Sequence, residues 1–140
     1  MKLLPVALSL FHRFQNNELE VWVQVRTDDG PYHGMLEFPG GKIEAEEEPL
    51  TGAVREVEEE VGIKIDPRLG KFMGTYRNML PNKTILLYVF LFPDLRELAG
   101  IGEWLKVEKT SLSSPYLGKI PPPNHQIIDD LFLSLYDGSI

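Results

Sequence analysis

Hydrophobic and polar positions along the chain predict several short β-strands. Residues 19–26 (LEVWVQVR) alternate, which is typical of a strand with one buried face. Residues 84–92 (TILLYVFLF) are almost wholly apolar, which is typical of a central strand covered on both faces. Shorter strands are predicted at 36–38, 63–65, 71–77 and 103–107. Strands therefore outnumber helices in the expected fold.

The first apolar run, residues 3–14, has two possible interpretations. With the residues before it, the run resembles the start of a signal peptide. However, a His-Arg pair follows at once, a proline lies early in the run, and no small-x-small cleavage site is present. We interpret 3–14 as a buried strand, followed by a turn at 15–18. No stretch approaches the ~20 apolar residues of a membrane span, so we expect a cytoplasmic protein without a membrane partner.

Two segments carry apolar residues at helical spacing. In the first, Leu50, Ala53, Val54, Val57 and Val61 recur every three or four residues. Pro49 suits the first helical position, and Gly62 suits the left-handed position just past the last turn. The second segment, residues 124–136, has the same periodicity. Two helices covering the sheet predict an α/β fold, or an α+β fold with a mixed sheet.

The composition limits the kinds of binding or catalytic site that this chain can form. The chain has 140 residues, of which 43% are hydrophobic and 25% charged, and these values are typical of one globular domain. A net charge of −7 argues against binding nucleic acid by charge alone. The absence of cysteine excludes disulfides, thiolate nucleophiles and zinc–thiolate sites. Any metal must therefore be bound by oxygen or imidazole ligands.

The first helix carries glutamates on one flank of its buried face. At about 100° per residue, Glu56, Glu59 and Glu60 fall within one arc beside the apolar stripe. Gly52 lies in the same arc and leaves space in front of it, whereas Glu58 falls on the other side and is expected to be solvated. A solvated acidic face is the ordinary interpretation of such a run, because glutamate is a good helix former.

Two features favour a cation at this arc. Glu56 and Glu60 are a like-charge pair one turn apart, which costs about 0.2–0.5 kcal/mol without a counterion. Both also lie toward the C-terminal, negative end of the helix dipole. A divalent cation such as Mg²⁺, which prefers oxygen ligands, would offset both penalties. Arg55 stands alone among these acids and is expected to orient one carboxylate.

A predicted turn at Pro39, Gly40 and Gly41 precedes the helix. Because the two glycines have no side chains, their backbone can approach a ligand closely. Their carbonyls can bind a metal and their N–H groups can bind a phosphate. Alone, a Gly-Gly turn is a weak signal.

Together these residues resemble the Nudix box. The match runs Gly41, five residues, Glu47, seven residues, Arg55-Glu56-Val57, one residue, Glu59-Glu60, one residue, Gly62-Ile63. Every fixed position is filled, which makes the signal very specific. The flanking segment 36–44 (LEFPGGKIE) resembles the MutT-like branch of the family.

The resemblance implies a Nudix-type α/β/α sandwich with a mixed β-sheet, formed by one domain over residues 1–140. It implies hydrolysis of a nucleoside diphosphate linked to another group X. It also implies that Mg²⁺ or Mn²⁺ is bound by Glu56, Glu59, Glu60 and the carbonyl of Gly40. Glu47 and Arg55 are then expected to support the loop and helix.

The general base remains open. In MutT-like enzymes it can come from a loop shortly before a Gly-Glu-Trp segment, which here is residues 102–104. The position that aligns with this base is Leu98, with Glu97 beside it. Glu97, Glu103 and a glutamate of the box are therefore all candidates.

The purine is read in MutT-like enzymes by the asparagine of a PPxN segment, and residues 121–124 (PPPN) fit this pattern. Asn124 is thus predicted to pair with a guanine edge, although it also suits the N-cap of the last helix. Arg26 resembles an arginine that contacts the nucleotide, although an exposed arginine at a strand end needs no function.

Further substrate contacts are expected from the Gly-Gly segment and from aromatic rings. Gly40 and Gly41 are predicted to meet the phosphates. Phe38, Tyr76 and Tyr88 are candidates for stacking on a base, although aromatic residues in such places are more often part of the core.

The expected function is a metal-dependent nucleoside triphosphate pyrophosphohydrolase that prefers guanine or 8-oxoguanine nucleotides and releases monophosphate and pyrophosphate. The alternatives are hydrolysis of RNA 5′ ends, hydrolysis of another nucleoside diphosphate derivative, and nucleotide binding without turnover. The last is disfavoured because no box glutamate is missing. We expect a monomer or homodimer that binds small nucleotides and forms no stable nucleic-acid complex.

Overall fold

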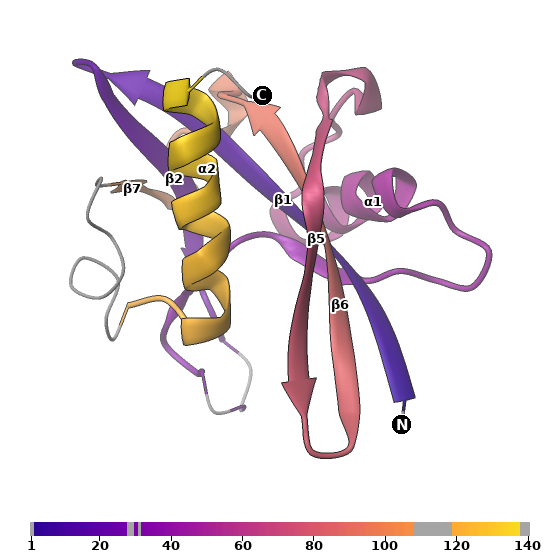
Figure 1. The fold of residues 1–140 in the computed structure, drawn as a ribbon. Helices are drawn as coiled ribbons and strands as arrows, with labels where there is room; N and C mark the ends of the chain where they lie inside the picture. Colours follow the sequence, from indigo (N-terminus) through magenta and orange to yellow (C-terminus); the bar gives the residue numbers. More distant parts are fainter. Residues whose placement is uncertain (1, 28–29, 31, 108–118, 138–140) are drawn as a thin grey trace.

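The computed structural model describes residues 2–27, 30, 32–107 and 119–137. In this part of the chain a seven-stranded mixed sheet lies between two α-helices (Figure 1). The predicted α/β/α arrangement is therefore confirmed. Within the same residues, no helix is long and apolar enough to cross a membrane.

The elements follow one another as predicted, apart from details given below. The strands are β1 (Lys2–Gln15), β2 (Glu18–Val25), β3 (Leu36–Glu37), β4 (Gly40–Lys42), β5 (Lys71–Leu80), β6 (Lys83–Pro93) and β7 (Glu103–Lys106). The α-helices are α1 (Pro49–Val61) and α2 (His125–Asp137). Short 3-10 helices occur at η1 (Pro67–Leu69), η2 (Arg96–Leu98) and η3 (Pro122–Asn124).

Strand β1 organises the sheet. The order is β3-β2-β1-β6-β5, with β4 also paired to β1 and β7 to β2. The β1–β6 pair is parallel, and the other pairs are antiparallel. The apolar strand β6 is covered on both faces and lies between β1 and β5, which confirms its prediction as a central strand.

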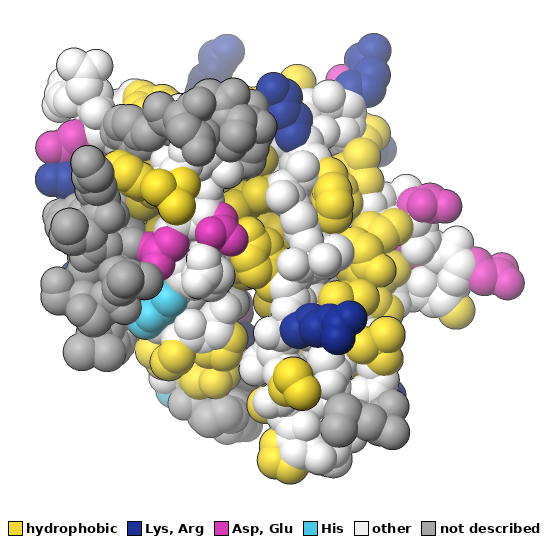
Figure 2. Space-filling model, in the orientation of Figure 1, with side chains coloured by type: hydrophobic (Ala, Val, Ile, Leu, Met, Phe, Trp, Pro, Cys, Tyr) yellow, Lys and Arg dark blue, Asp and Glu magenta, His cyan; other side chains and the backbone are white. Residues whose placement is uncertain are grey.

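The sheet has one hydrophobic cluster on each face. The α2-side cluster contains residues from β1, β2, β6 and α2, among them Leu8, Val21, Leu87, Ile128 and Leu131. The α1-side cluster contains Ala7, Phe11, Trp22, Ala53, Val57 and Phe92. On the face drawn in Figure 2, hydrophobic side chains lie between scattered Lys and Arg side chains.

Helix α1 begins and ends at the predicted residues. Pro49 occupies its first turn, and Gly62 follows it with a left-handed φ of 79°. The Gly62 N–H donates to the carbonyl of Glu58, which completes the last turn. Ala53 and Val57 are fully buried, and Glu58 is exposed, as its helical position predicts.

Two local predictions were wrong. Residues 63–65 form no strand, although Ile63 and Ile65 are buried in the α1-side cluster. The Asp66 carboxylate accepts a hydrogen bond from the Arg68 N–H (2.9 Å), which starts η1 and ends the extended segment before it pairs. The Gly-Gly segment is not a turn either, because Gly40–Lys42 pairs with β1 as strand β4.

Candidate active site

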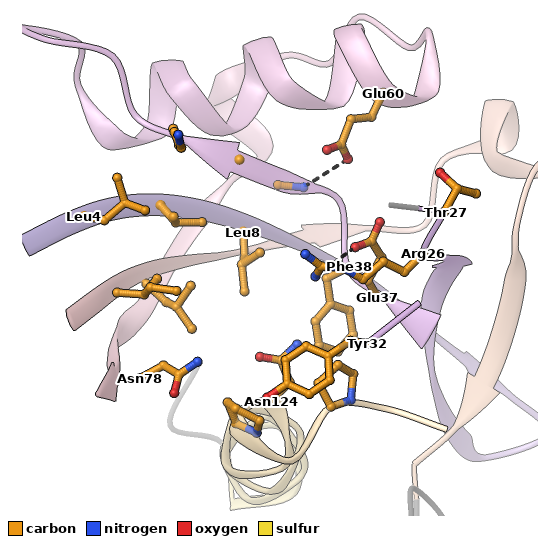
Figure 3. Close-up of a pocket in the computed structure, with 18 residues that line it drawn as sticks. Leu4, Leu8, Arg26, Thr27, Tyr32, Glu37, Phe38, Glu60, Asn78 and Asn124 are labelled. Carbon is orange, nitrogen blue, oxygen red and sulfur yellow. Dashed lines mark hydrogen bonds and ion pairs between the residues drawn. The ribbon is translucent and has the colours of Figure 1, made fainter. Parts of the chain in front are cut away.

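A cavity of about 430 Å³ opens on the α2 side of the sheet (Figure 3). Its floor is the part of the sheet where β5, β6, β1 and β4 lie side by side. One end reaches β4 and the last turn of α1, and the other reaches β5 and η3. The cavity therefore spans three strand spacings, about 14 Å, across the sheet.

The strand register explains the apolar floor. Residues paired across neighbouring strands project on the same face, so Leu4 and Ile85 form one row, and Val6 and Leu87 form the next. Leu8 continues this face one row further. Such a surface suits the flat face of a ring rather than a charged group.

The glycines of β4 allow the backbone to lie close to β1 and α1. A Cβ on Gly40 would lie 2.5 Å from a methyl carbon of Leu8, and one on Gly41 would lie within 2.6 Å of both Glu56 carboxylate oxygens. The Gly40 N–H donates a hydrogen bond to the Glu60 carboxylate (3.2 Å). The Glu56 and Glu60 carboxylates thus lie close to the Gly-Gly segment.

Arg55 connects the acidic residues of this region. It donates two hydrogen bonds to the Glu47 carboxylate (2.8 and 3.0 Å), one to Glu56 (2.9 Å) and one to Glu59 (3.2 Å). A further bond to the carbonyl of Lys42 (2.9 Å) connects the helix to β4. A bidentate arginine–carboxylate pair restricts the orientation of both groups. Arg55 and Glu47 therefore hold α1 against the loop before it.

The pKa values of two carboxyls reflect these contacts. The hydrogen bonds from Arg55 lower the pKa of Glu47 to about 2. Although Glu60 is exposed as a whole, its carboxyl lies at the cavity edge, and partial loss of water raises its pKa to about 7. The nearby charges of Glu37 and Glu56 raise it further, whereas the Gly40 N–H lowers it. Positive charge at this end of the cavity would favour the ionised form of Glu60.

The donors present have the chemistry of a divalent-cation site. Among the described residues, no three carboxylates or imidazoles already converge as a ligand set. Glu59 and Glu56 are hydrogen-bonded to Arg55, and Glu60 to Gly40. Oxygen donors beside a glycine backbone fit a hard cation such as Mg²⁺. By this donor chemistry the residues fit the group.

The other predicted site residues divide into two groups. Phe38, Gly40, Gly41, Arg26 and Asn124 line the cavity. Arg26 forms an ion pair with Glu37 (3.4 Å) at the same edge. The contacts with substrate and metal that were assigned to these residues stay predictions.

The candidate bases and two aromatic residues lie elsewhere. Glu97 lies on η2 and Glu103 on β7, and neither is among the described residues that line the cavity. Tyr88 packs against the α1-side cluster, on the opposite face of the sheet. Tyr76 lies on the cavity's face of the sheet, but its hydroxyl donates to Asp130 (2.7 Å). Neither tyrosine lines the cavity.

Five further polar residues among those described line the cavity and were not predicted from the sequence: Thr27, Tyr32, Glu37, Lys42 and Asn78. Tyr32 and Asn124 lie together at one end (Figure 3). Asn78 carried no recognisable signal, because it directly follows the strand predicted at 71–77, and only the extension of β5 to Leu80 places it within a strand. Tyr32 and Lys42 reach the cavity only in the assembled fold.

Comparison with known proteins agrees with this arrangement. The family described as NUDIX domain matches residues 4–129. The chain is 34% identical over 137 residues to 8-oxo-dGTP diphosphatase of Escherichia coli (strain K12), covering 94% of this chain and 98% of that protein. It is 42% identical over 78 residues to human diphosphoinositol polyphosphate phosphohydrolase 3-alpha, covering 50% of this chain and 46% of that protein.

The fold is also found in solved structures. A MutT/nudix family protein from Enterococcus faecalis superimposes with a TM-score of 0.78 at 14% identity, covering 98% of this chain and 63% of that one. At this identity the similarity concerns the fold alone. The family match covers most of the chain and includes the complete box. The chain therefore belongs to the Nudix family, as a MutT-like hydrolase of phosphoanhydride bonds.

Proposed function

We propose that this protein hydrolyses nucleoside triphosphates to monophosphate and pyrophosphate, with a preference for guanine or 8-oxoguanine nucleotides. The observation that carries the proposal is the division of one cavity into an apolar end and a glycine- and carboxylate-rich end. The 34% identity to an 8-oxo-dGTP diphosphatase along nearly the whole chain supports it. The substrate in this proposal is a free nucleotide, and the working unit is a single domain as a monomer or homodimer.

The two ends suit the two parts of a nucleotide. The floor of Leu4, Ile85 and Leu87 offers an apolar surface to a base, and Asn124 offers an amide to the edge of that base. At the other end, Gly40 and Gly41 of β4 line the cavity beside the Glu56 and Glu60 carboxylates. The phosphate chain would therefore lie beside α1.

The divalent cation belongs to this phosphate end. Nudix hydrolases generally need divalent metal ions. We propose Mg²⁺ or Mn²⁺, held by Glu56, Glu59, Glu60 and the carbonyl of Gly40. When bound, such an ion neutralises phosphate charge and lowers the pKa of a coordinated water.

The chain's own residues hold this arrangement and move the proton. Arg55 and Glu47 position α1, so that its glutamates face β4. A box glutamate is the proposed base, because Glu60 lines the cavity whereas Glu97 and Glu103 do not. For Glu97 or Glu103 to act as the base, η2 or β7 would have to move toward the phosphate end of the cavity.

A nucleotide panel with Mg²⁺ tests the reaction. Release of pyrophosphate and monophosphate from nucleoside triphosphates is expected, with the highest kcat/KM for guanine or 8-oxoguanine substrates. Glu59→Gln should abolish turnover while the fold stays intact. Glu58→Gln is the matched control, because Glu58 is exposed on the same helix. Wild-type rates for Glu59→Gln would contradict the ligand assignment.

Three other functions make different predictions in the same assay. An enzyme for RNA 5′ ends would cleave RNA with a 5′ triphosphate faster than free nucleotides. A basic stripe is the usual surface for binding RNA, but Lys and Arg form no stripe on the face drawn in Figure 2. A diphosphoinositol polyphosphate hydrolase would release phosphate from inositol pyrophosphates, although that similarity covers only half of this chain. A binding module would bind nucleotides and release no product.

The role of Asn124 is tested separately. Its side-chain amide makes no hydrogen bond to any residue that the structure describes, so it does not cap α2 there. Asn124→Ala should weaken discrimination among purines and leave metal binding unchanged. An unchanged base preference would mean that Asn124 does not read the base.

A further inference from the structure

Asn78 is an exception on its strand. The face of β5 that turns toward α2 carries Met73, Tyr76, Asn78 and Leu80, and the first two pack against the α2-side cluster. An asparagine is unfavourable within a strand, both for its backbone preference and for lost packing. The position of Asn78 on this face of β5 therefore requires an explanation.

The register places Asn78 in the floor of the cavity. It pairs with Ile85, which pairs with Leu4, so these three side chains form one row across β5, β6 and β1. Leu4 and Ile85 are apolar, whereas Asn78 brings an amide to the β5 end of that row. No hydrogen bond joins this amide to any residue in the described part of the chain. A polar group that lies on an apolar wall and has no partner among the described residues is suited to meet a ligand.

A second amide lies at the same end of the cavity. Asn124 comes from η3, far from Asn78 in the sequence, and both side chains lie at the end opposite Glu60 (Figure 3). The charged residues that line the cavity are Arg26, Glu37, Lys42 and Glu60. Arg26 and Glu37 also lie away from Asn78 (Figure 3). Asn78 and Asn124 are both neutral amides, and each has a donor and an acceptor.

A hydrogen-bonded connection holds the two amides in relation to each other. Tyr76, two residues before Asn78 on the same face, donates its hydroxyl to the Asp130 carboxylate (2.7 Å) on α2. Asp130 also accepts from Gln126 (2.8 Å), one turn earlier on the helix. Strand β5, at the edge of the sheet, is therefore attached to the helix that begins directly after Asn124.

We propose that Asn78 is a base-recognition residue, which contacts one edge of a purine while Asn124 contacts another. This inference rests on the proposed nucleotide substrate and extends it to a residue outside the Nudix box. The side-chain carbonyl oxygen of Asn78 accepts a hydrogen bond from a ring or exocyclic N–H of the base. Its NH₂ group donates to a ring nitrogen or a carbonyl oxygen of the base. Guanine and adenine present donors and acceptors in different order, so two amides on separate elements distinguish them better than one.

Binding of nucleoside monophosphates tests the proposal without requiring turnover. The dissociation constants of GMP, AMP and CMP are measured by calorimetry for the wild type, Asn78→Leu and Asn78→Asp. In Asn78→Leu the GMP constant should rise about tenfold, as expected for a lost hydrogen-bond partner, while the CMP constant changes less than about twofold. Asn78→Asp accepts but does not donate, so it should retain more affinity for GMP than for AMP.

Thr75→Leu is the matched control, because Thr75 is exposed on the same strand and faces the other way. Unchanged ratios of the three constants in both Asn78 variants would overturn the proposal, even if the wild type hydrolyses nucleotides. Base-selective binding that is lost in Asn78→Leu would support it, even if the wild type released no product and the proposed hydrolysis failed. If the wild type bound none of the three nucleotides, the proposal would also be overturned. Ratios are compared because partial unfolding would scale all three constants together.

Discussion

Substitution of Tyr76 by phenylalanine would test whether the connection between β5 and α2 stabilises the fold. The change removes one hydroxyl and leaves the ring in place against the α2-side cluster. The hydrogen bond that is lost is 2.7 Å long and ends on the Asp130 carboxylate. Asp130 keeps its second hydrogen bond, from Gln126 (2.8 Å), so its charge is not left without a partner.

The expected loss follows from these contacts. A hydrogen bond to a charged group contributes about 1.5–3 kcal/mol when it is well shielded. Tyr76 and Asp130 are both partly exposed, so water competes for each group and lowers that value. We therefore expect the free energy of unfolding to fall by about 1–2 kcal/mol, which for a domain of this size lowers Tm by about 3–8 °C.

Urea denaturation followed by circular dichroism measures this difference. Tyr88→Phe is the matched control, because Tyr88 is also partly buried and makes no hydrogen bond to a described residue. A double-mutant cycle with Asp130→Asn would isolate the coupling between the two side chains. If Tyr76→Phe and Tyr88→Phe were equally stable to within about 0.5 kcal/mol, the connection would not stabilise the fold.

Three further predictions concern Gly41 and the ionisable side chains of Glu47 and Tyr76. Gly41→Ala would place a methyl group within 2.6 Å of both Glu56 oxygens and displace them, so kcat should fall at least about tenfold; unchanged steady-state kinetics would contradict this. Because the pKa of Glu47 is held at about 2, below its ordinary 4.5, its stabilising effect is present above pH 4.5 and is lost as pH falls toward 2. Glu47→Gln should therefore unfold with a smaller difference between pH 3 and pH 7 than the wild type, and an equal difference would refute the Arg55 pairing. Burial and Asp130 raise the pKa of Tyr76 above its ordinary 10, so the stability that Tyr76 contributes is present below pH 10 and is lost as the pH rises further. Tyr76→Phe should therefore lose less stability than the wild type between pH 8 and high pH, and identical unfolding curves for the two proteins would contradict this contribution.

Local signals predicted the parts of the fold that depend on neighbouring residues. The bounds of α1 were correct because Pro49 and Gly62 determine its first turn and its end through their own backbone preferences. Strand β6 was correct because an apolar run of its length is buried on both faces almost anywhere in a domain. In both cases the information lies within a dozen residues.

Predictions failed where distant partners decide the structure. Gly40 and Gly41 have the composition of a turn, but a close approach to β1 makes them a strand. Ile63 and Ile65 have the composition of a strand, but they are buried against the α1-side cluster without pairing to a strand. Asn78 reaches the site only because β6 and β1 place it in register with the cavity floor.

The parallel pairing of β1 with β6 has a consequence for how the chain folds. Each of eleven residues of β1 pairs with the residue 81 positions later, so this contact closes a very long loop. At translation rates of about 5–20 residues per second, β1 waits about 4–16 s for its partner. During that time its central apolar segment has the early β2 and β4 as partners on one side and an open edge on the other. The order of synthesis thus leaves the β1 edge open to aggregation until β6 arrives.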